Sequence, residues 1–380
     1  MDDNLKERQE MRETLEGSGE RPARSIGITR RMFIHRSLLG GAGAAFGWFP
    51  LVNTLDLTLG ATEPFRFGWI SDTHLYPKEV NTRFVDKAKR AVKELQAMKP
   101  AADFLMFGGD LAQLGDPVEL DLGNQILNET KIPKHYIPGE HDWYLDLGQK
   151  WTKLFGEPNW TFDHKRVRFV GLDTVSRGPD YWTAKKMSPK ERMGHMATLD
   201  GSVAGAWAGV GRDQLEWLNK VLSNWPKDSP VIVFSHNPLY EYYPPWNFWV
   251  RDWREVHEVL KPFANVTNIH GHTHQVLYNE LGKMRSIGML ATSWPWPYAP
   301  EGVPALTKCM TRADPGDFFD GVGWSRIGMN AASKVENEYV MWRKDVLSDT
   351  PVDSGCADNV NQIVHPRIAD QEWPYYGGYK

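Results

Sequence analysis

Short apolar runs and helical stripes of apolar residues alternate along the chain from residue 65 onward. Continuous apolar runs of four to eight residues predict buried strands, and apolar positions repeating every three to four residues predict helices. The expected strands are residues 65–71, 102–109, 134–139, 166–174, 230–236 and 265–271, and the expected helices are residues 83–99, 118–130, 212–225 and 254–263. This alternation is typical of an α/β domain with largely parallel sheet.

The remaining segments are less regular. Residues 276–345 predict mostly strand and loop, with the clearest strand at 337–344, and residues 176–210 have weak periodicity and predict a loop or insertion. We therefore divide the chain into an N-terminal region (1–61), one catalytic domain (62–345) and a C-terminal tail (346–380).

The N-terminal region is polar and charged over residues 1–29, which predicts disorder. Arg30 and Arg31 then precede Phe33 and a Gly/Ala-rich, weakly apolar run. This run is too short and too rich in glycine for a membrane-spanning helix. It resembles a twin-arginine export signal, with a weak small-residue cleavage site ending at Ala61. The sequence thus predicts a periplasmic or otherwise exported protein that engages the twin-arginine export machinery.

The composition is that of an ordinary soluble globular protein, with 41% hydrophobic and 24% charged residues. A formal charge of −4 argues against nucleic-acid binding through bulk electrostatics. The two cysteines, Cys309 and Cys356, form no metal or redox motif. An oxidising compartment would allow a disulfide between them, and the sequence leaves that pairing open.

Acids or histidines follow five of the predicted strands. They are Asp72, His74, Asp110, Glu140, His141, Asp142, His236, His272 and His274. One such residue is usually a turn residue or a helix cap. Here five strand ends carry them in order, with Gly109, Gly139 and Gly271 in three of the blocks. Because ligands of α/β sheets bind at the carboxyl ends of the strands, we expect these side chains to converge on one metal site.

The five blocks resemble those of the calcineurin-like metallophosphoesterases. They read D-T-H at 72–74, G-D at 109–110, G-E-H-D at 139–142, H at 236 and G-H-T-H at 271–274. Their order is similar to that of bacterial cyclic-nucleotide phosphodiesterases and purple acid phosphatases. The resemblance implies a four-layer α/β/β/α sandwich and a hydrolase for a small phosphomonoester or phosphodiester, but it names no substrate.

The resemblance also implies a role for each residue. The first metal would be held by Asp72, His74, Asp110 and His274, and the second by Asp110, Glu140, His236 and His272. A hydroxide bridging two ions about 3.5–4 Å apart would attack the phosphoryl group. His141 would protonate the leaving oxygen or stabilise the developing charge, and Asp142 would orient His141. Mixed carboxylate and imidazole ligands favour Fe, Mn or Zn.

Glu140 departs from the family pattern, which has a neutral Asn at this position. With two divalent ions, three carboxylates and one hydroxide leave roughly zero net charge, whereas the Asn version keeps about one positive charge. Three readings stay open. A trivalent ion such as Fe(III) restores the balance, phosphate binds less tightly and the chemistry changes, or Glu140 turns away from the metals.

Several other residues are weaker candidates. His270 is either a buried strand-end residue or a second-layer partner, and Asn237 either contacts the substrate or caps a turn. Asp163 and His164 are expected in a hairpin turn. The Trp/Pro stretches at 242–249 and 294–298 either shape a substrate pocket or pack irregular loops. The acidic loop with Asp314, Asp317 and Asp320 is expected to be solvated.

Two functional hypotheses follow from these patterns. The first is an exported dinuclear metallophosphoesterase. The second is an exported dinuclear metalloprotein without hydrolytic activity, which binds metal or oxyanions or acts in redox chemistry. The unusual Glu140 and the aromatic-rich tail favour keeping the second.

The export signal makes a direct prediction. Replacing Arg30 and Arg31 with Lys should leave the protein in the cytoplasm, folded and loaded with metal, because the signal is read as a twin-arginine address. Cell fractionation with immunodetection checks this. Continued export of the double variant would contradict the assignment.

Overall fold

A computed structural model of the 380-residue chain describes residues 63–177, 186–196, 208–242, 248–295 and 322–342. The predicted export signal, the C-terminal tail and both cysteines lie outside these residues, so the proposed ends of the domain stay predictions. No helix in the described part of the chain is both long and apolar enough to cross a bilayer.

The first sheet has five strands in the order β11-β10-β1-β2-β3. In chain order they are β1 (Phe65–Ile70), β2 (Phe104–Phe107), β3 (Lys134–Tyr136), β10 (Gly323–Met329) and β11 (Val335–Met341). Strands β1, β2 and β3 are parallel, while β10 and β11 extend the sheet as an antiparallel hairpin beside β1.

The second sheet has six strands in the order β4-β5-β6-β7-β9-β8. They are β4 (Trp160–His164), β5 (Val167–Leu172), β6 (Val231–Ser235), β7 (Val266–His270), β8 (Leu277–Leu281) and β9 (Met284–Gly288). Strands β5, β6, β7 and β9 are parallel, and β4 and β8 are antiparallel strands at the two edges. The largely parallel sheet expected from the sequence is therefore the centre of each sheet, with antiparallel margins.

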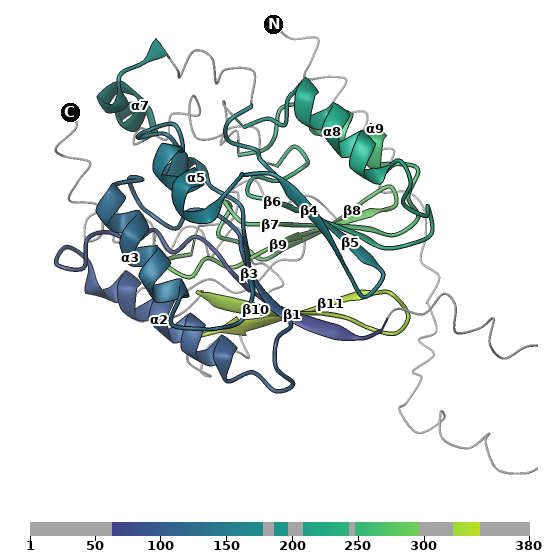
Figure 1. Cartoon of the computed structure of the whole chain (residues 1–380), viewed down its shortest axis with the longest axis horizontal. Coiled ribbons are helices and arrows are strands. Elements are labelled where there is room, and N and C mark those ends of the chain that lie inside the picture. Colours follow the sequence, from purple (N-terminus) through teal and green to yellow (C-terminus); the bar gives the residue numbers. More distant parts are fainter. Residues whose placement is uncertain (1–62, 178–185, 197–207, 243–247, 296–321, 343–380) are drawn as a thin grey trace, which may run out of the picture. The chain divides into compact units, whose positions relative to one another are not determined.

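Helices cover the outer face of each sheet (Figure 1). The helices within the described residues are α2 (Thr82–Gln96), α3 (Pro117–Leu127), α4 (Glu140–Trp143), α5 (Gln149–Phe155), α7 (Pro189–Met196), α8 (Arg212–Leu222) and α9 (Trp253–Leu260). Helices α2, α3 and α5 lie against the first sheet, and α8 and α9 against the second. The expected α/β/β/α sandwich is confirmed.

Successive side chains along a strand point in opposite directions, and this divides the core into layers. In β6, Ile232 and Phe234 point between the sheets, while Val231 and Val233 pack beneath α8 and α9. Strand β2 divides in the same way, since Phe104 and Met106 face the other sheet. Successive strand residues point to opposite faces, so strands buried on both faces are continuously apolar. This explains why the sequence shows unbroken apolar runs.

Short elements account for the errors of the sequence-based assignment. Helix α7 lies within residues 176–210, where weak periodicity indicated a loop, and α4 and α5 follow the third strand without having been predicted. Helix α2 begins at Thr82 because the side chain of Asn81 accepts hydrogen bonds from the amides of Arg83 and Phe84. It ends before the Lys99–Pro100 bond, as the proline predicted.

The aromatic layer between the sheets predicts a large effect on stability. Phe169 is fully buried, and its ring centroid lies 4.8 Å from that of Phe162 and 5.3 Å from that of Phe104. Phe169→Ala should lower the free energy of unfolding by about 3–5 kcal/mol because it leaves a cavity. Val118→Ala is the control, since Val118 is 60% exposed and should change stability by less than about 0.5 kcal/mol. Urea denaturation measures both, and equal losses would contradict the layer assignment.

Candidate metal centre

The nine predicted site residues come from the carboxyl ends of five strands. Strands β1, β2 and β3 of the first sheet are followed by Asp72, Asp110 and Glu140, and strands β6 and β7 of the second by His236 and His272. Backbone hydrogen bonds tie the loops together, from the amide of Asp72 to the carbonyl of Gly109 (2.9 Å) and from that of Gly271 to the carbonyl of His236 (3.1 Å). One edge of the sandwich thus gathers groups that are up to 202 positions apart in sequence.

Five of the seven predicted ligands have left-handed backbone conformations. These are Asp72 (φ 53°), His74 (φ 44°), Asp110 (φ 52°), His272 (φ 63°) and His274 (φ 49°). A non-glycine residue rarely adopts this region, although Asp and His do so more readily than most. Each instance costs on the order of 1–3 kcal/mol and persists only where the surroundings enforce it. The strand ends are therefore bent to aim these side chains at one place.

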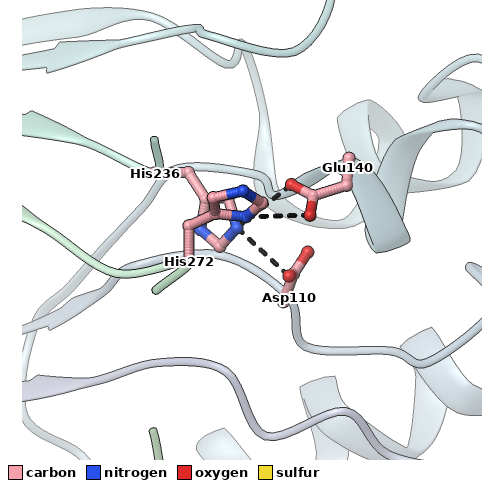
Figure 2. A group of neighbouring side chains, drawn as sticks. All are labelled: Asp110, Glu140, His236 and His272. Atoms are coloured by element: carbon pink, nitrogen blue, oxygen red, sulfur yellow. Dashed lines mark ion pairs between the residues drawn. The ribbon is translucent and has the colours of Figure 1, made fainter. Parts of the chain in front are cut away.

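The ligands form two buried groups. Asp110, Glu140, His236 and His272 offer ligand atoms within 4.8 Å of one another, and so do Asp72, His74 and His274. Figure 2 shows the first group, in which Glu140 and Asp110 point at the two imidazoles. In the second group the Nε2 atoms of His74 and His274 lie 3.1 Å apart, and His274 Nε2 lies 3.3 Å from Asp72 Oδ1.

Asp110 lies between the two groups. Its Oδ2 is 3.1 Å from Nε2 of His236 in one group and 3.6 Å from Nε2 of His74 in the other. Its Oδ1 accepts a hydrogen bond from the amide of His141 (3.1 Å), which fixes the carboxylate in place. A carboxylate with one oxygen facing both groups suits a ligand shared by two ions, the role that the family resemblance implies for Asp110.

Three histidines are oriented by carbonyl oxygens. Nδ1 of His74 lies 2.9 Å from Oε1 of Gln113, Nδ1 of His236 lies 2.8 Å from the carbonyl of Gly108, and Nδ1 of His274 lies 2.9 Å from that of Trp294. A carbonyl oxygen can only accept, so each Nδ1 carries a proton, and Nε2 is the ring nitrogen that can bind a cation when it is deprotonated. All three Nε2 atoms face the centre. This is the usual arrangement around metal-binding imidazoles.

The centre contains polar atoms that the protein itself does not satisfy. Oε2 of Glu140, Nε2 of His236 and Nε2 of His272 are buried without a hydrogen-bond partner. Buried polar atoms are normally paired, and leaving one unpaired costs about 1–3 kcal/mol. Metal ions in the centre would satisfy Oε2 of Glu140 and Nε2 of His236, and the mixed oxygen and nitrogen donors fit transition-metal ions. The residues therefore fit a dinuclear metal centre.

Charge within the cluster shifts several pKa values. Burial alone would raise the pKa of Glu140, but the imidazoles of His272 and His236 outweigh it and hold this pKa well below its usual range. For His236, burial opposes the charged form, but Asp110 and Glu140 raise its pKa well above the usual value. The protein alone thus keeps Glu140 ionised, which is the state a cation needs.

The role predicted for Asp142 is corrected by the structure. Its carboxylate accepts hydrogen bonds from the amides of Ala112 (2.9 Å) and Gly139 (3.0 Å), and it does not contact the His141 imidazole. Nδ1 of His141 instead lies 2.6 Å from the carbonyl of Gln113. Asp142 therefore fixes the backbone on both sides of the centre, and a main-chain oxygen orients His141.

Gln113 is the residue that sequence reasoning missed. Its side chain contacts His74 and its carbonyl contacts His141, and it is fully buried. Its only sequence signal is its place three residues after the Gly109–Asp110 block. Sequence patterns give no direct sign of a contact made through a main-chain carbonyl.

The weaker candidates from the sequence lie in different places in the structure. His270 is a buried strand-end residue whose pKa burial lowers to about 4, and Oδ1 of Asn237 accepts a hydrogen bond from the hydroxyl of Thr174 (2.7 Å). Asp163 and His164 are the last residues of β4, beside the expected hairpin turn. Asp314, Asp317 and Asp320 lie outside the described residues.

The two aromatic–proline stretches are described only in part, but both reach the centre. The ring centroid of Phe248 lies 4.7 Å from that of His272, and the ring centroid of Trp294 lies 4.2 Å from that of His74. Both aromatic side chains are buried, and they pack against metal-ligand candidates from opposite groups. Phe248 and Trp294 therefore pack beside imidazoles of both groups.

Comparison with known proteins decides the family. The model of the calcineurin-like phosphoesterase family matches residues 65–276, which include all nine site residues. The chain belongs to the calcineurin-like phosphoesterases. The family resemblance drawn from the five blocks is confirmed.

Individual relatives are distant. A protein of Arcobacter nitrofigilis named as a probable glycerophosphodiester phosphodiesterase is 26% identical over 174 residues, which is 44% of this chain and 55% of that protein. The 3′,5′-cyclic adenosine monophosphate phosphodiesterase of Escherichia coli K12 is 25% identical over 59% of this chain and 75% of its own length. The match thus spans only about half of the Arcobacter relative.

A solved structure shows the same fold. A dimetal phosphatase from Danio rerio superposes with a TM-score of 0.50 at 16% identity, covering 73% of this chain and 99% of that one. At this identity the likeness concerns the fold alone. It agrees with the two-sheet sandwich described above.

Gly139 provides a test of the centre's packing. A Cβ at this position would lie 2.0 Å from Oδ1 of Asp110 and 2.7 Å from its amide, so the Asp110 carboxylate would have to move. Gly139→Ala should lower metal affinity by at least about 10-fold, the smaller effect seen when a ligand's support is disturbed. Equilibrium dialysis with metal analysis measures this.

Gly328→Ala is the matched control. Its added Cβ would approach no atom closer than 3.4 Å, an ordinary contact in β10. This variant should keep the metal affinity of the unaltered protein. Equal metal affinity in both variants would contradict the assignment of Asp110 to the centre.

Proposed function

We propose that this protein is a metal-dependent hydrolase of phosphoesters and that phosphodiesters are its preferred class. The observation that carries the proposal is the pair of buried ligand groups that share Asp110. The family to which the chain belongs gives the reaction class. The names of the Arcobacter and Escherichia relatives support a diester substrate.

The geometry supports an assignment of ligands to the two ions. Asp72, His74 and His274 would hold the first ion and Glu140, His236 and His272 the second, with Asp110 shared. When bound, a pair of ions supplies Lewis acidity and an activated water. The donor set supports Fe, Mn or Zn, and the third carboxylate also allows a pair of Fe(III) with a divalent ion.

His141 is placed to handle the proton of the leaving group. It is the most exposed of the nine site residues, at 9%, so it lies closest to the solvent side of the centre. The Gln113 carbonyl holds its Nδ1, which leaves Nε2 to carry a proton toward the leaving oxygen. Its ring centroid is 4.6 Å from that of His74, so this proton would be held beside the first group.

Glu140 supports the preference for diesters. Its carboxylate removes one unit of the positive charge that the centre would offer with the family's usual Asn. A phosphomonoester is largely a dianion near neutral pH, and a phosphodiester is a monoanion. Lower positive charge weakens the attraction of the dianion more, because the Coulomb energy scales with the product of the charges.

We further propose that the protein acts outside the cytoplasm. The support is the Arg30–Arg31 pair followed by a weakly apolar run. The twin-arginine route carries folded proteins, which suits a centre built from five separate strand ends.

A direct assay tests the proposed reaction. The metal-loaded protein should hydrolyse bis(p-nitrophenyl) phosphate with a higher kcat/KM than p-nitrophenyl phosphate. His141→Ala should keep both ions and lose about 10²–10⁴-fold in kcat, as expected for a lost general acid. Asp110→Ala should lose both ions.

His164→Ala is the control for loss of a histidine. His164 pairs with Asp103 at 2.7 Å, next to the first residue of β2 and at the opposite end of that strand from Asp110. Its replacement should leave turnover unchanged. A metal-loaded protein that hydrolyses neither ester would instead support the non-hydrolytic metalloprotein. A preference for the monoester would contradict the diester assignment.

A further inference from the structure

Glu140 presents both carboxylate oxygens to the imidazoles of its group. Oε1 lies 2.9 Å from Nδ1 of His272, and Oε2 lies 3.2 Å from Nε2 of His236 (Figure 2). The side chain is 2% exposed, and Oε2 has no hydrogen-bond partner. The position after Gly139 therefore holds a charged oxygen donor directed into the centre, which excludes the reading in which Glu140 turns away.

This donor makes the two groups equal in composition. Each has one carboxylate of its own, Asp72 or Glu140, and each has two imidazoles. Asp110 faces both groups through one oxygen. A neutral residue at position 140 would leave one group with only the shared carboxylate. The two halves thus carry the same formal charge because of Glu140.

Both carboxylates that belong to one group alone are held by neighbouring polar groups. Asp72 Oδ2 accepts a hydrogen bond from the Ser71 hydroxyl (2.5 Å), and Oδ1 accepts one from the amide of His272 (3.1 Å). Such bonds withdraw some of the charge that a carboxylate offers a cation. The two oxygens of Glu140 likewise face ring nitrogens of His272 and His236, so both carboxylates are already in contact with protein groups.

We propose that Glu140 matches the affinities of the two halves, so that the protein takes up two like divalent ions with similar dissociation constants. This rests on the dinuclear centre of the proposed function, but not on hydrolysis. The physical reason is that the affinity of a site for a hard or borderline cation depends on the number of charged ligands and on the rigidity of the site. Both halves are buried, and each has a histidine held by a carbonyl oxygen.

Titration of Mn²⁺ into the metal-depleted full-length protein tests the proposal by calorimetry. The unaltered protein should bind two ions with dissociation constants within about 10-fold of each other. Glu140→Gln keeps the length and an oxygen donor but removes the charge. One ion should keep its affinity, and the other should weaken by at least about 100-fold, the upper end of the effect of removing a group beyond the ligands.

Two further variants separate charge from other effects. Glu140→Asp keeps the charge and should retain two ions. Asp103→Asn removes a carboxylate that also faces an imidazole, that of His164, but next to the start of β2 rather than after its end. It should titrate like the unaltered protein.

Either of two results would overturn the proposal. One is a difference greater than 10-fold between the two constants of the unaltered protein, a measurement that requires no variant to fold. The other is a Glu140→Gln isotherm equal to that of the unaltered protein. Because the titration contains no substrate, a protein with two matched ions and no esterase activity would contradict the proposed function and leave this inference standing.

Discussion

The repulsion among three buried carboxylates is the constraint on which the rest of the structure depends. Asp72, Asp110 and Glu140 are each at most 2% exposed, so water cannot screen their charges. The imidazoles of His236, His272 and His274 compensate part of this charge. Two cations would complete the compensation and also satisfy the unpaired buried atoms. The three buried carboxylates whose repulsion opposes folding are therefore the same groups that can bind the cations.

The two-sheet sandwich brings these charged side chains together and holds them in place. The aromatic layer between the sheets fixes the carboxyl ends of β1, β2 and β3 beside those of β6 and β7. Left-handed backbone at five ligands turns the side chains inward, and Gly139 leaves room for the Asp110 carboxylate. The stability of the layered core offsets the strain and charge burial at its edge.

The sequence predicted most of the fold and the seven candidate ligands that the structure brings together, because strands buried on both faces leave unbroken apolar runs and because each ligand follows such a run. It failed where the determinants are not periodic. The short helix α4 begins at Glu140 itself, and α7 has little amphipathic pattern. The family resemblance also implied that Asp142 orients His141, whereas its carboxylate accepts hydrogen bonds from the amides of Ala112 and Gly139. The Gln113 carbonyl that replaces it has no signature in the side chains.

Anomalous diffraction from crystals of the Mn²⁺-loaded protein would show whether two ions share Asp110. We expect two anomalous peaks about 3.5–4 Å apart, the separation usual for two-metal sites. Asp110 should contact both peaks, Asp72 one of them and Glu140 the other. A single peak, or two peaks of which Asp110 touches only one, would contradict it.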